Sequence, residues 1–307
     1  MILTGMIVAA VVALYVVAAL AQVYRLGISF QQAVLYLPLK AAFRISDGGM
    51  RIARQADAPV IYAISHQSRL DPALMLALLP DDTLHILDEE SAESSWLEPF
   101  RTLARSIAFN ASHVFVSRRL VRHLRGKGRL AVYFPQTVEP DLKSFRLFRA
   151  VARIAVTARA DIVAIHIGGS RHLPMSLASE AEAPRRWLPS LTIAALDPIS
   201  LDTSIVRAGR APTTSSNALF DRVAEARVAA TPQRSPFSAI AEAARLYGPE
   251  RTIVEDGMTG ALSYRDMMIA ARVLGARFAA ASSGGEAVGL MLPNSVGLAT
   301  SFVGLQS

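Results

Sequence analysis

The first hydrophobic feature of the chain is an apolar stretch at its N-terminus. Residues 1–24 contain no charged side chain, and residues 7–20 are almost entirely Val, Ala, Leu, Ile and Tyr. A helix of this length extends for about 36 Å, whereas the hydrocarbon core of a bilayer is about 30 Å thick. The pattern therefore predicts a membrane-spanning anchor over residues 1–24.

A cleaved signal peptide and a buried core helix are the two alternatives for this stretch. A signal peptide normally has a basic start and a shorter apolar run, and this segment has no early Lys or Arg. A helix that is apolar on all sides is uncommon at the extreme terminus of a chain. We therefore favour a retained anchor.

The charges that follow the anchor predict its orientation. Before Asp57 there is one acidic residue, Asp47, and the basic residues are Arg25, Lys40, Arg44, Arg51 and Arg54. Positive charge beside a span favours the cytoplasmic side. We expect an inner (cytoplasmic) membrane location, with the catalytic part of the chain facing the cytoplasm. Residues 25–58 mix apolar and polar side chains around Pro38, which predicts an interfacial segment.

From Pro59 onward, short apolar runs alternate with stretches of helical spacing. The predicted buried strands are 60–65, 84–87, 131–134, 162–167 and 191–196. The predicted helices are 72–79, 96–107, 118–125 and 144–159. This alternation favours an α/β fold, with a mixed sheet covered by helices, over residues 59–201.

The composition changes after this region. Residues 197–236 are rich in Pro, Thr, Ser, Ala and Arg, so residues 202–234 are predicted to be a linker with a modest helix over 219–228. A second unit is predicted over residues 235–307. Ser263 and Asp266 resemble a capping box in front of an amphipathic helix, and a short strand is expected over 287–292 before a final apolar helix.

Basic residues are concentrated in one region of a chain whose formal net charge is +7. Residues 101–153 contain twelve Lys or Arg against Glu139 and Asp141, a local balance of +10. Nucleic acid, anionic lipid, and a phosphorylated or acidic-carrier substrate are all possible partners of such a stretch. Beside a membrane anchor we favour the lipid and substrate interpretations, since no nucleic-acid motif or stacking aromatic set is present.

The chain contains no cysteine and six histidines. Disulfides, a thiol nucleophile and thiolate metal ligands are therefore excluded. The histidines other than His66 show no metal-ligand spacing, and no Gly-x-Ser-x-Gly elbow is present. We expect no metal and no serine-hydrolase chemistry.

The most informative stretch for chemistry is residues 63–72. His66 ends a predicted strand, and Asp71 begins a predicted helix five residues later. A carboxylate in that place can orient an imidazole, whose other nitrogen is then free to take a proton from a hydroxyl. The alternative is a His and an Asp that only cap a helix.

This segment resembles the first motif of the glycerolipid acyltransferase family, His-x-x-x-x-Asp after Asn or Ser. The resemblance covers roughly residues 38–201 and implies that His66 is the general base and Asp71 its orienting partner.

The family's second motif has an Arg after a short strand, and this Arg binds the phosphate of the acceptor. Residues 114–119 match it, which implies this role for Arg118, with Arg119 as the second choice. A solvated basic helix start is the alternative for both.

The third and fourth family motifs are altered. The third, Phe-Pro-Glu-Gly, reads Phe134, Pro135, Gln136 and Thr137 here, and these residues are implied to contact the substrate. A neutral amide accepts hydrogen bonds more weakly than a carboxylate, and Thr restricts a turn that Gly would permit. The fourth motif, Val-Pro-Val, lacks its proline at residues 163–165.

The last seventy residues resemble the opening of an adenylate-forming acyl ligase. Segments 235–240, 248–252, 262–265 and 288–295 carry this resemblance, while the phosphate loop and the later ATP motifs of that family are missing. We therefore expect residues 235–307 to be a truncated start of an AMP-binding domain without ligase activity. Acyltransferase followed by ligase is the arrangement of the bifunctional acyl-carrier-protein synthetases / 2-acylglycerophosphoethanolamine acyltransferases.

Together these resemblances imply an acyltransferase that moves a fatty acyl group from acyl carrier protein or acyl-CoA to the hydroxyl of a lysophospholipid. They imply no cofactor beyond the thioester cosubstrate, a membrane-lipid partner and no nucleic acid. The alternative is a degenerate acyltransferase that acts as a membrane-anchoring and carrier-docking module of an acyl ligase.

Overall fold

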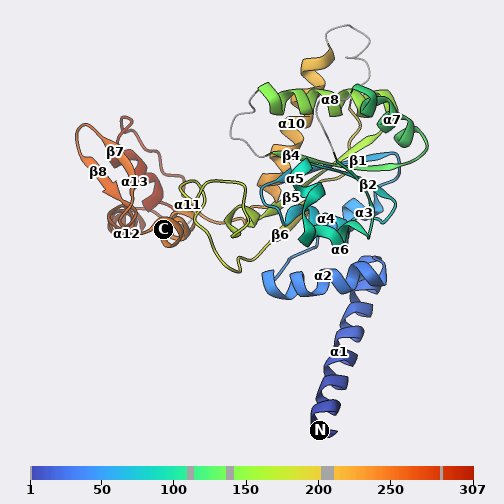
Figure 1. Ribbon diagram of the computed structural model, residues 1–307. Helices are drawn as coiled ribbons and strands as arrows, with labels where there is room; N and C mark the ends of the chain where they lie inside the picture. Colours follow the sequence, from blue (N-terminus) through green and yellow to red (C-terminus); the bar gives the residue numbers. More distant parts are fainter. Residues whose placement is uncertain (1, 109–113, 136–141, 202–210, 284–285) are drawn as a thin grey trace. The chain divides into compact units, whose positions relative to one another are not determined.

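The computed structural model describes residues 2–108, 114–135, 142–201, 211–283 and 286–307 of the chain. The chain divides into two compact units, Met1–Thr231 and Pro232–Ser307. The first unit contains the N-terminal helix and a six-stranded sheet, and the second contains helices and a two-stranded hairpin (Figure 1).

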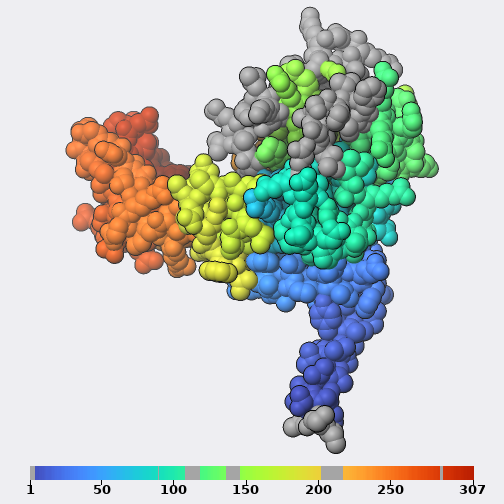
Figure 2. All heavy atoms as spheres, viewed as in Figure 1, coloured from blue at the N-terminus to red at the C-terminus, as the bar shows by residue number. Residues whose placement is uncertain are grey.

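The N-terminal apolar stretch forms helix α1 (Ile2–Leu26). Its segment Thr4–Leu26 is long and apolar enough to cross a membrane, and only 6% of the most apolar window is buried. Figure 2 shows the N-terminal part of α1 extending from the rest of its unit without cover on this face. A buried core helix therefore does not describe this segment, and a membrane anchor or a signal sequence fits it.

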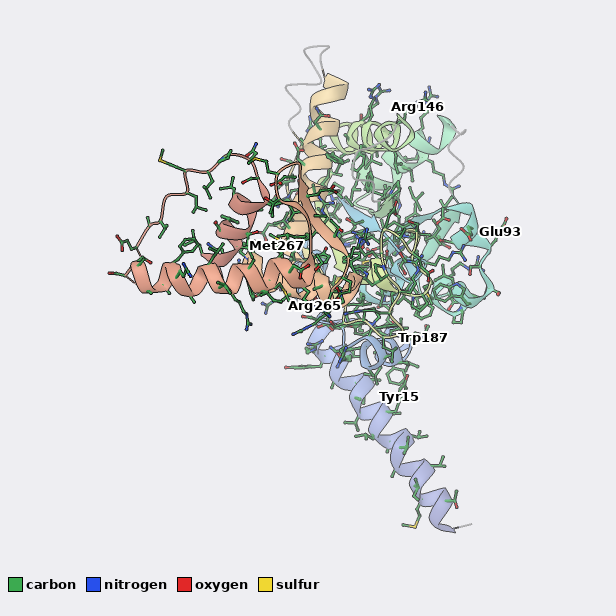
Figure 3. The ribbon with its side chains drawn as sticks, turned by 90° about the vertical axis from the view of Figure 1, so that its left-hand side faces the viewer. Tyr15, Glu93, Arg146, Trp187, Arg265 and Met267 are labelled. Carbon is green, nitrogen blue, oxygen red and sulfur yellow. The ribbon has the colours of Figure 1, made fainter. Side chains whose placement is uncertain are left out.

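Helix α2 (Phe30–Phe43) follows α1 after a short break and docks on the sheet unit. Ser29 and Gln32 form a capping box at its start. The Gln32 side chain also donates hydrogen bonds to the carbonyls of Leu76 and Leu79, at 3.1 and 2.7 Å. The Tyr15 hydroxyl of α1, labelled in Figure 3, donates to the Val34 carbonyl at 2.5 Å. The predicted interfacial segment is thus helical around Pro38 and hydrogen-bonded on both sides.

A buried carboxylate joins the end of α1 to α2. Asp47 is 4% exposed and accepts hydrogen bonds from Arg25 (2.7 and 2.5 Å), Lys40 (2.7 Å) and the Tyr36 hydroxyl (2.6 Å). Burial alone would raise the pKa of Asp47, but these hydrogen bonds from Lys40, Tyr36 and Arg25 outweigh it and hold the pKa below its usual value. Asp47 therefore holds the C-terminal end of α1 against α2 and fixes the point from which the apolar helix extends.

The sheet contains six strands in the order β3-β2-β4-β1-β5-β6. Their bounds are β1 (Val60–His66), β2 (Thr83–Leu87), β3 (Arg105–Ala108), β4 (Arg129–Pro135), β5 (Asp161–Gly168) and β6 (Thr192–Ala195). All neighbouring pairs are parallel except β5 and β6, which are antiparallel. The predicted α/β fold with a mixed sheet is confirmed.

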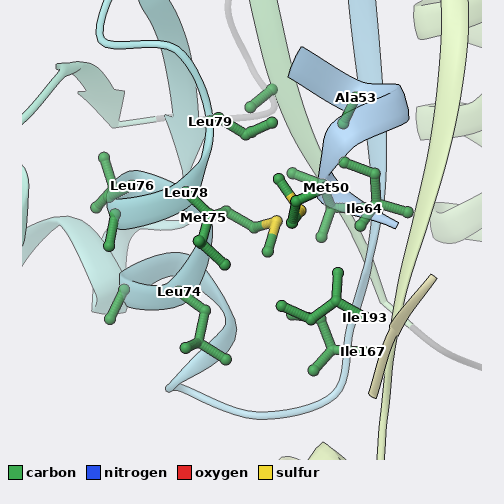
Figure 4. Packing of buried hydrophobic residues seen from close by; sticks show 14 of the residues in the cluster. Met50, Ala53, Ile64, Leu74, Met75, Leu76, Leu78, Leu79, Ile167 and Ile193 are labelled. Carbon is green, nitrogen blue, oxygen red and sulfur yellow. The ribbon is translucent and has the colours of Figure 1, made fainter. Parts of the chain in front are cut away.

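Alternate residues of the central strand β1 point to two separate cores. Tyr62 and Ile64 pack with α1, α2 and the short helices α3 (Met50–Gln55) and α4 (Asp71–Leu78). Figure 4 shows the interior of this core around Met50 and Met75. Ile61 and Ala63 pack with α7 (Val114–Arg125), α8 (Leu142–Ala158) and α10 (Ala211–Ala229). Helices therefore cover both faces, as a largely parallel sheet requires.

Two elements of the first unit differ from the sequence-based prediction. The predicted helix over 96–107 is wrong: a 3₁₀ turn (Ser95–Leu97) and helix α6 (Glu98–Arg101) end before strand β3, because Arg105–Ala108 pairs with β2. The helix predicted over 219–228 is confirmed but is longer: residues 211–229, inside the predicted linker, form α10, whose Leu219 is buried in the core with α8. Among the described residues, the unit also contains helix α5 (Glu89–Glu93) and a 3₁₀ turn over Ser170–His172.

The second unit contains α11 (Pro236–Tyr247), the hairpin β7 (Thr252–Asp256) and β8 (Gly260–Ser263), α12 (Tyr264–Ala281) and α13 (Val296–Gly304). The Ser263 side chain caps α12 by accepting from the Asp266 N–H. The predicted strand over 287–292 is wrong, because these residues pair with no described strand, and Met291 is almost fully exposed. The proposed division of the chain into an acyltransferase domain and a ligase fragment stays a prediction.

We predict that Asp47→Asn destabilises the first unit by about 2 kcal/mol, because it weakens hydrogen bonds to charged groups. The pKa of Asp47 is lowered from 3.8, so its contribution is complete above that value and is lost as the pH falls through the lower native pKa. Guanidinium unfolding in detergent micelles, at neutral and acidic pH, measures both effects. Asp57→Asn, at an exposed position, is the matched control. Equal stability of the two variants would contradict the assignment.

Candidate functional site

His66 is the last residue of β1 and lies beside Pro135, the last residue of β4, in the parallel register. The carboxyl ends of parallel strands share one edge of the sheet, which is where open α/β sheets bind ligands. The His66 side chain is 11% exposed, so it is held by the protein and still accessible. The predicted strand-end position of His66 is confirmed.

Asp71 is the first residue of α4, and its side chain is fully buried. Its Oδ2 atom accepts hydrogen bonds from the backbone N–H groups of Gln67 (2.7 Å) and Ser68 (2.9 Å). The same oxygen lies 3.7 Å from His66 Nδ1. The carboxyl group is therefore fixed by the turn that joins β1 to α4, and it faces the imidazole.

The His66–Asp71 contact is longer than a hydrogen bond in this conformation. Both His66 Nδ1 and Asp71 Oδ1 are buried and have no hydrogen-bond partner among the described residues. Catalytic hydrogen bonds are often long in ligand-free structures and shorten when substrate binds. The imidazole nitrogen that faces Asp71 is therefore free to form that hydrogen bond when substrate binds.

A second carboxyl group lies on the other side of the imidazole. Asp88 Oδ1 is 4.0 Å from His66 Nε2, and the Asp88 side chain is 50% exposed. Asp88 follows strand β2 directly and caps α5 by accepting from the Ser91 N–H. Asp88 is not among the residues that the sequence motifs predict for the site, although an acidic residue just after a buried strand is the signal that places it at the same sheet edge as His66.

Tyr133 and His85 form the wall behind His66. The Tyr133 ring meets the His66 ring edge-on, with centroids 5.7 Å apart, and its hydroxyl shares a 2.9 Å hydrogen bond with His85 Nδ1. Burial lowers the pKa of His85 to about 3 and raises the pKa of Tyr133 well above its usual value. Both groups are therefore neutral at physiological pH; Tyr133 packs against the imidazole, and His85 holds Tyr133 in place.

The turn that contains Gln67 is also held from the opposite side. The Leu177 N–H donates to the Gln67 carbonyl at 2.8 Å, and the Arg69 N–H donates to Met175. The Gln67 side chain lies 3.4 Å from His166 Nε2, and burial lowers the pKa of His166 to about 4. The segment after β5 therefore closes over the turn and restricts its movement.

The residues implied by the second and third motifs lie in different surroundings. Arg118 and Arg119 are exposed on α7, and their described contacts do not include His66 or Asp71. Arg118 lines a groove between α7 and α8. Phe134 is 1% exposed and stacks on Phe148 in the core, at a centroid distance of 4.3 Å. Pro135 is exposed beside His66.

Gln136 and Thr137 lie outside the described residues, so their implied substrate contacts stay a prediction. Within the parts of the chain that the structure describes, no group of three or more His, Asp or Glu side chains is arranged to hold a metal ion. The chemistry that the described edge of the sheet offers is thus that of an imidazole between two carboxyl groups.

No family model matches the chain. Among solved structures, the chain is similar to the 1-acyl-sn-glycerophosphate (LPA) acyltransferase PlsC from Thermotoga maritima. The two are 17% identical, with a TM-score of 0.40, and the similarity covers 67% of this chain and 83% of the other.

The depressed pKa of His85 predicts a pH-dependent stability. An unfolded chain binds a proton at His85 below about pH 6.5, whereas the native state stays neutral until about pH 3. Stability is therefore lost as the pH falls through this window, by up to about 1.4 kcal/mol per pH unit for one such group. His85→Gln keeps a hydrogen-bonding side chain and should reduce the slope by that amount in unfolding experiments between pH 6.5 and 4. An unchanged slope would show that His85 is not buried neutral.

Proposed function

We propose that this chain is a membrane-associated acyltransferase in which His66 is the general base. The observation that carries the proposal is the pairing of His66 with the buried Asp71 at the carboxyl edge of the sheet, 3.7 Å apart and held by the β1–α4 turn. The sequence motif around the pair, which resembles that of glycerolipid acyltransferases, supports the same reaction.

In the proposed reaction, Asp71 keeps the proton of the neutral imidazole on Nδ1, which leaves Nε2 to accept a proton from the acceptor hydroxyl. The hydroxyl oxygen attacks the carbonyl carbon of an acyl thioester, and the carbon–sulfur bond breaks. The thiolate leaves and receives the proton from the imidazolium. No covalent enzyme intermediate and no metal are needed.

Asp88 gives the positively charged imidazolium a second carboxyl neighbour. In this mechanism positive charge develops on the imidazole as it takes the hydroxyl proton, so attraction by Asp71 and Asp88 stabilises the transition state. Asp88 is half exposed, and solvent therefore screens its contribution. We assign Asp71 the larger effect and Asp88 a smaller one.

The acceptor in this proposal is a lysophospholipid, and the donor is acyl carrier protein or acyl-CoA. The exposed apolar surface of α1 supports a lipid acceptor, because a helix of this length and hydropathy fits a bilayer. The second motif implies that Arg118, with Arg119 beside it, binds the acceptor phosphate; both lie on α7, so this role and the binding of an anionic donor are alternatives for these arginines. We expect no ligase activity from residues 235–307, which lack the phosphate loop of the ligases they resemble.

We predict that His66→Ala lowers acyl transfer by about a hundredfold or more, which is the usual contribution of a general base. The assay supplies labelled acyl carrier protein or acyl-CoA with a lysophospholipid to membranes that contain the chain. His123→Ala, on α7, is the control for loss of a histidine away from the site. A wild-type chain that is no more active than His66→Ala with any donor would favour the alternative, an anchoring and docking module.

Asp88→Asn removes the second charge and retains an oxygen that can cap α5. A half-exposed charge contributes up to about 1 kcal/mol, so we expect kcat to fall by about fivefold with little change in KM. Asp57→Asn again serves as the control. A loss as large as that of His66→Ala would make Asp88, rather than Asp71, the principal partner of the imidazole.

A further inference from the structure

A groove on the outer surface of the first unit separates helices α7 and α8. It encloses about 440 Å³, and Val121 and Ile154 form apolar parts of its lining. Its basic lining residues are Arg118, Arg122, Arg125 and Arg153. The guanidinium of Arg125 donates to the Thr157 carbonyl, which ties the two helices together at one end of the groove.

The charged residues that line the groove are all basic. The described segments 114–135 and 142–158 contain no Asp or Glu, and the four arginines that line the groove are exposed. Like charges held this close raise the local potential and attract an anionic partner. In the described contacts, Arg118, Arg122 and Arg153 have no carboxylate neighbour to neutralise them.

The groove and helix α1 lie on opposite faces of the sheet, so the bilayer that α1 would cross does not reach the groove. Leu120 and Leu124 of α7 pack with Ile61 of β1, whereas Ala19 of α1 packs in the core that contains Tyr62. These faces of the sheet are opposite, and Figure 1 shows α7 and α8 on one side with α1 and α2 on the other. In Figure 3, Arg146 of α8 lies in the upper part of the unit and Tyr15 of α1 in the lower part. The sheet thus stands between the groove and a membrane that α1 spans.

The dimensions of the groove fit a helix better than a single phosphate. Arg118 and Arg125 are seven residues apart on α7, which is about 10 Å along the helix axis. Two packed helices lie about 8–10 Å apart, so a row of three arginines on α7 faces Arg153 of α8 across an apolar strip. An acidic amphipathic helix presents carboxylates at this spacing with apolar side chains between them.

We infer that the α7–α8 groove is the docking surface for an acidic helix of a soluble carrier protein that delivers the acyl thioester. The inference rests on the proposed function, since that function requires a thioester donor. The inference assigns the docking surface of the donor. On this assignment the surface recognises the carrier protein and not coenzyme A.

The test compares the charge-reversed double variant Arg122→Glu/Arg153→Glu with the wild-type chain, both in nanodiscs of neutral phosphatidylcholine so that α1 is already in lipid. The binding probe is fluorescent acyl carrier protein without an acyl group, which separates docking from catalysis. Arg277→Glu on α12, exposed and outside the groove, is the control for a change of charge. Arg122→Gln/Arg153→Gln provides a milder second variant, and thermal unfolding confirms that each variant is folded.

We expect the double reversal to weaken carrier binding by at least about tenfold, with wild-type affinity falling steeply as salt rises. The carrier affinity of Arg122→Gln/Arg153→Gln should lie between those of the wild type and the double reversal. Arg277→Glu should bind the carrier as tightly as the wild type does. In the transfer assay, the double reversal should raise KM for the carrier-bound donor and leave use of acyl-CoA unchanged.

Three results would overturn the docking assignment. Unchanged carrier binding by the double reversal would exclude the groove as the surface. An equal loss with acyl-CoA would make it a phosphate subsite, and a loss of binding to phosphatidylglycerol vesicles alone would make it a lipid surface. Failure of the proposed function is separate: carrier binding that depends on Arg122 and Arg153 without any acyl transfer would uphold docking and reject catalysis.

Discussion

The carboxyl group of Asp71 holds together the turn on which the candidate site depends. It is fully buried, and it accepts the N–H groups of Gln67 and Ser68, which would otherwise be unpaired at the end of β1. Asp71 is also the first residue of α4, where the helix dipole favours a negative group. One side chain therefore ends a strand, starts a helix and faces the imidazole of His66. The geometry of the candidate site and the local fold therefore have the same origin.

Buried side chains and hydrogen bonds surround this turn on every side that the structure describes. All eight residues of α4 are buried, and the neutral Tyr133–His85 pair packs behind the imidazole. The segment after β5 hydrogen-bonds back to Gln67 and Arg69. A general base needs this kind of support, because misplacement by about 1 Å costs a large part of the rate. The exposed edge of His66 is then the part left for a substrate.

The two faces of the sheet have different roles in the proposed function. One face carries α1 and α2, joined by the buried Asp47, and it directs the apolar helix away from the unit. The other carries α7 and α8 with their arginines. A lipid acceptor and a soluble donor would approach from different sides and meet at the strand ends. This separation follows from the alternation of side chains along β1, which sends Tyr62 and Ile61 to opposite cores.

The sequence by itself determined the elements whose signals are local. The apolar helix, the strands around β1 and the position of His66 before Asp71 follow from hydrophobic runs and from one short spacing. Residues 96–107 show the limit of this approach, because Arg105–Ala108 is a strand only through its pairing with β2. Residues 287–292 show the converse, since an apolar run without a described partner forms no strand.

Only the tertiary structure decided which distant residues meet. Asp88 follows β2 and Tyr133 lies in β4, and both lie beside His66 because parallel strands bring their ends to one edge, while His85 of β2 holds Tyr133 from behind. It also placed Arg118 in a groove with Arg153 of a different helix, which sequence spacing could not show. Local spacing encodes the turn and its Asp71, whereas the surroundings of His66 depend on strand order, which is set by the packing of the whole sheet.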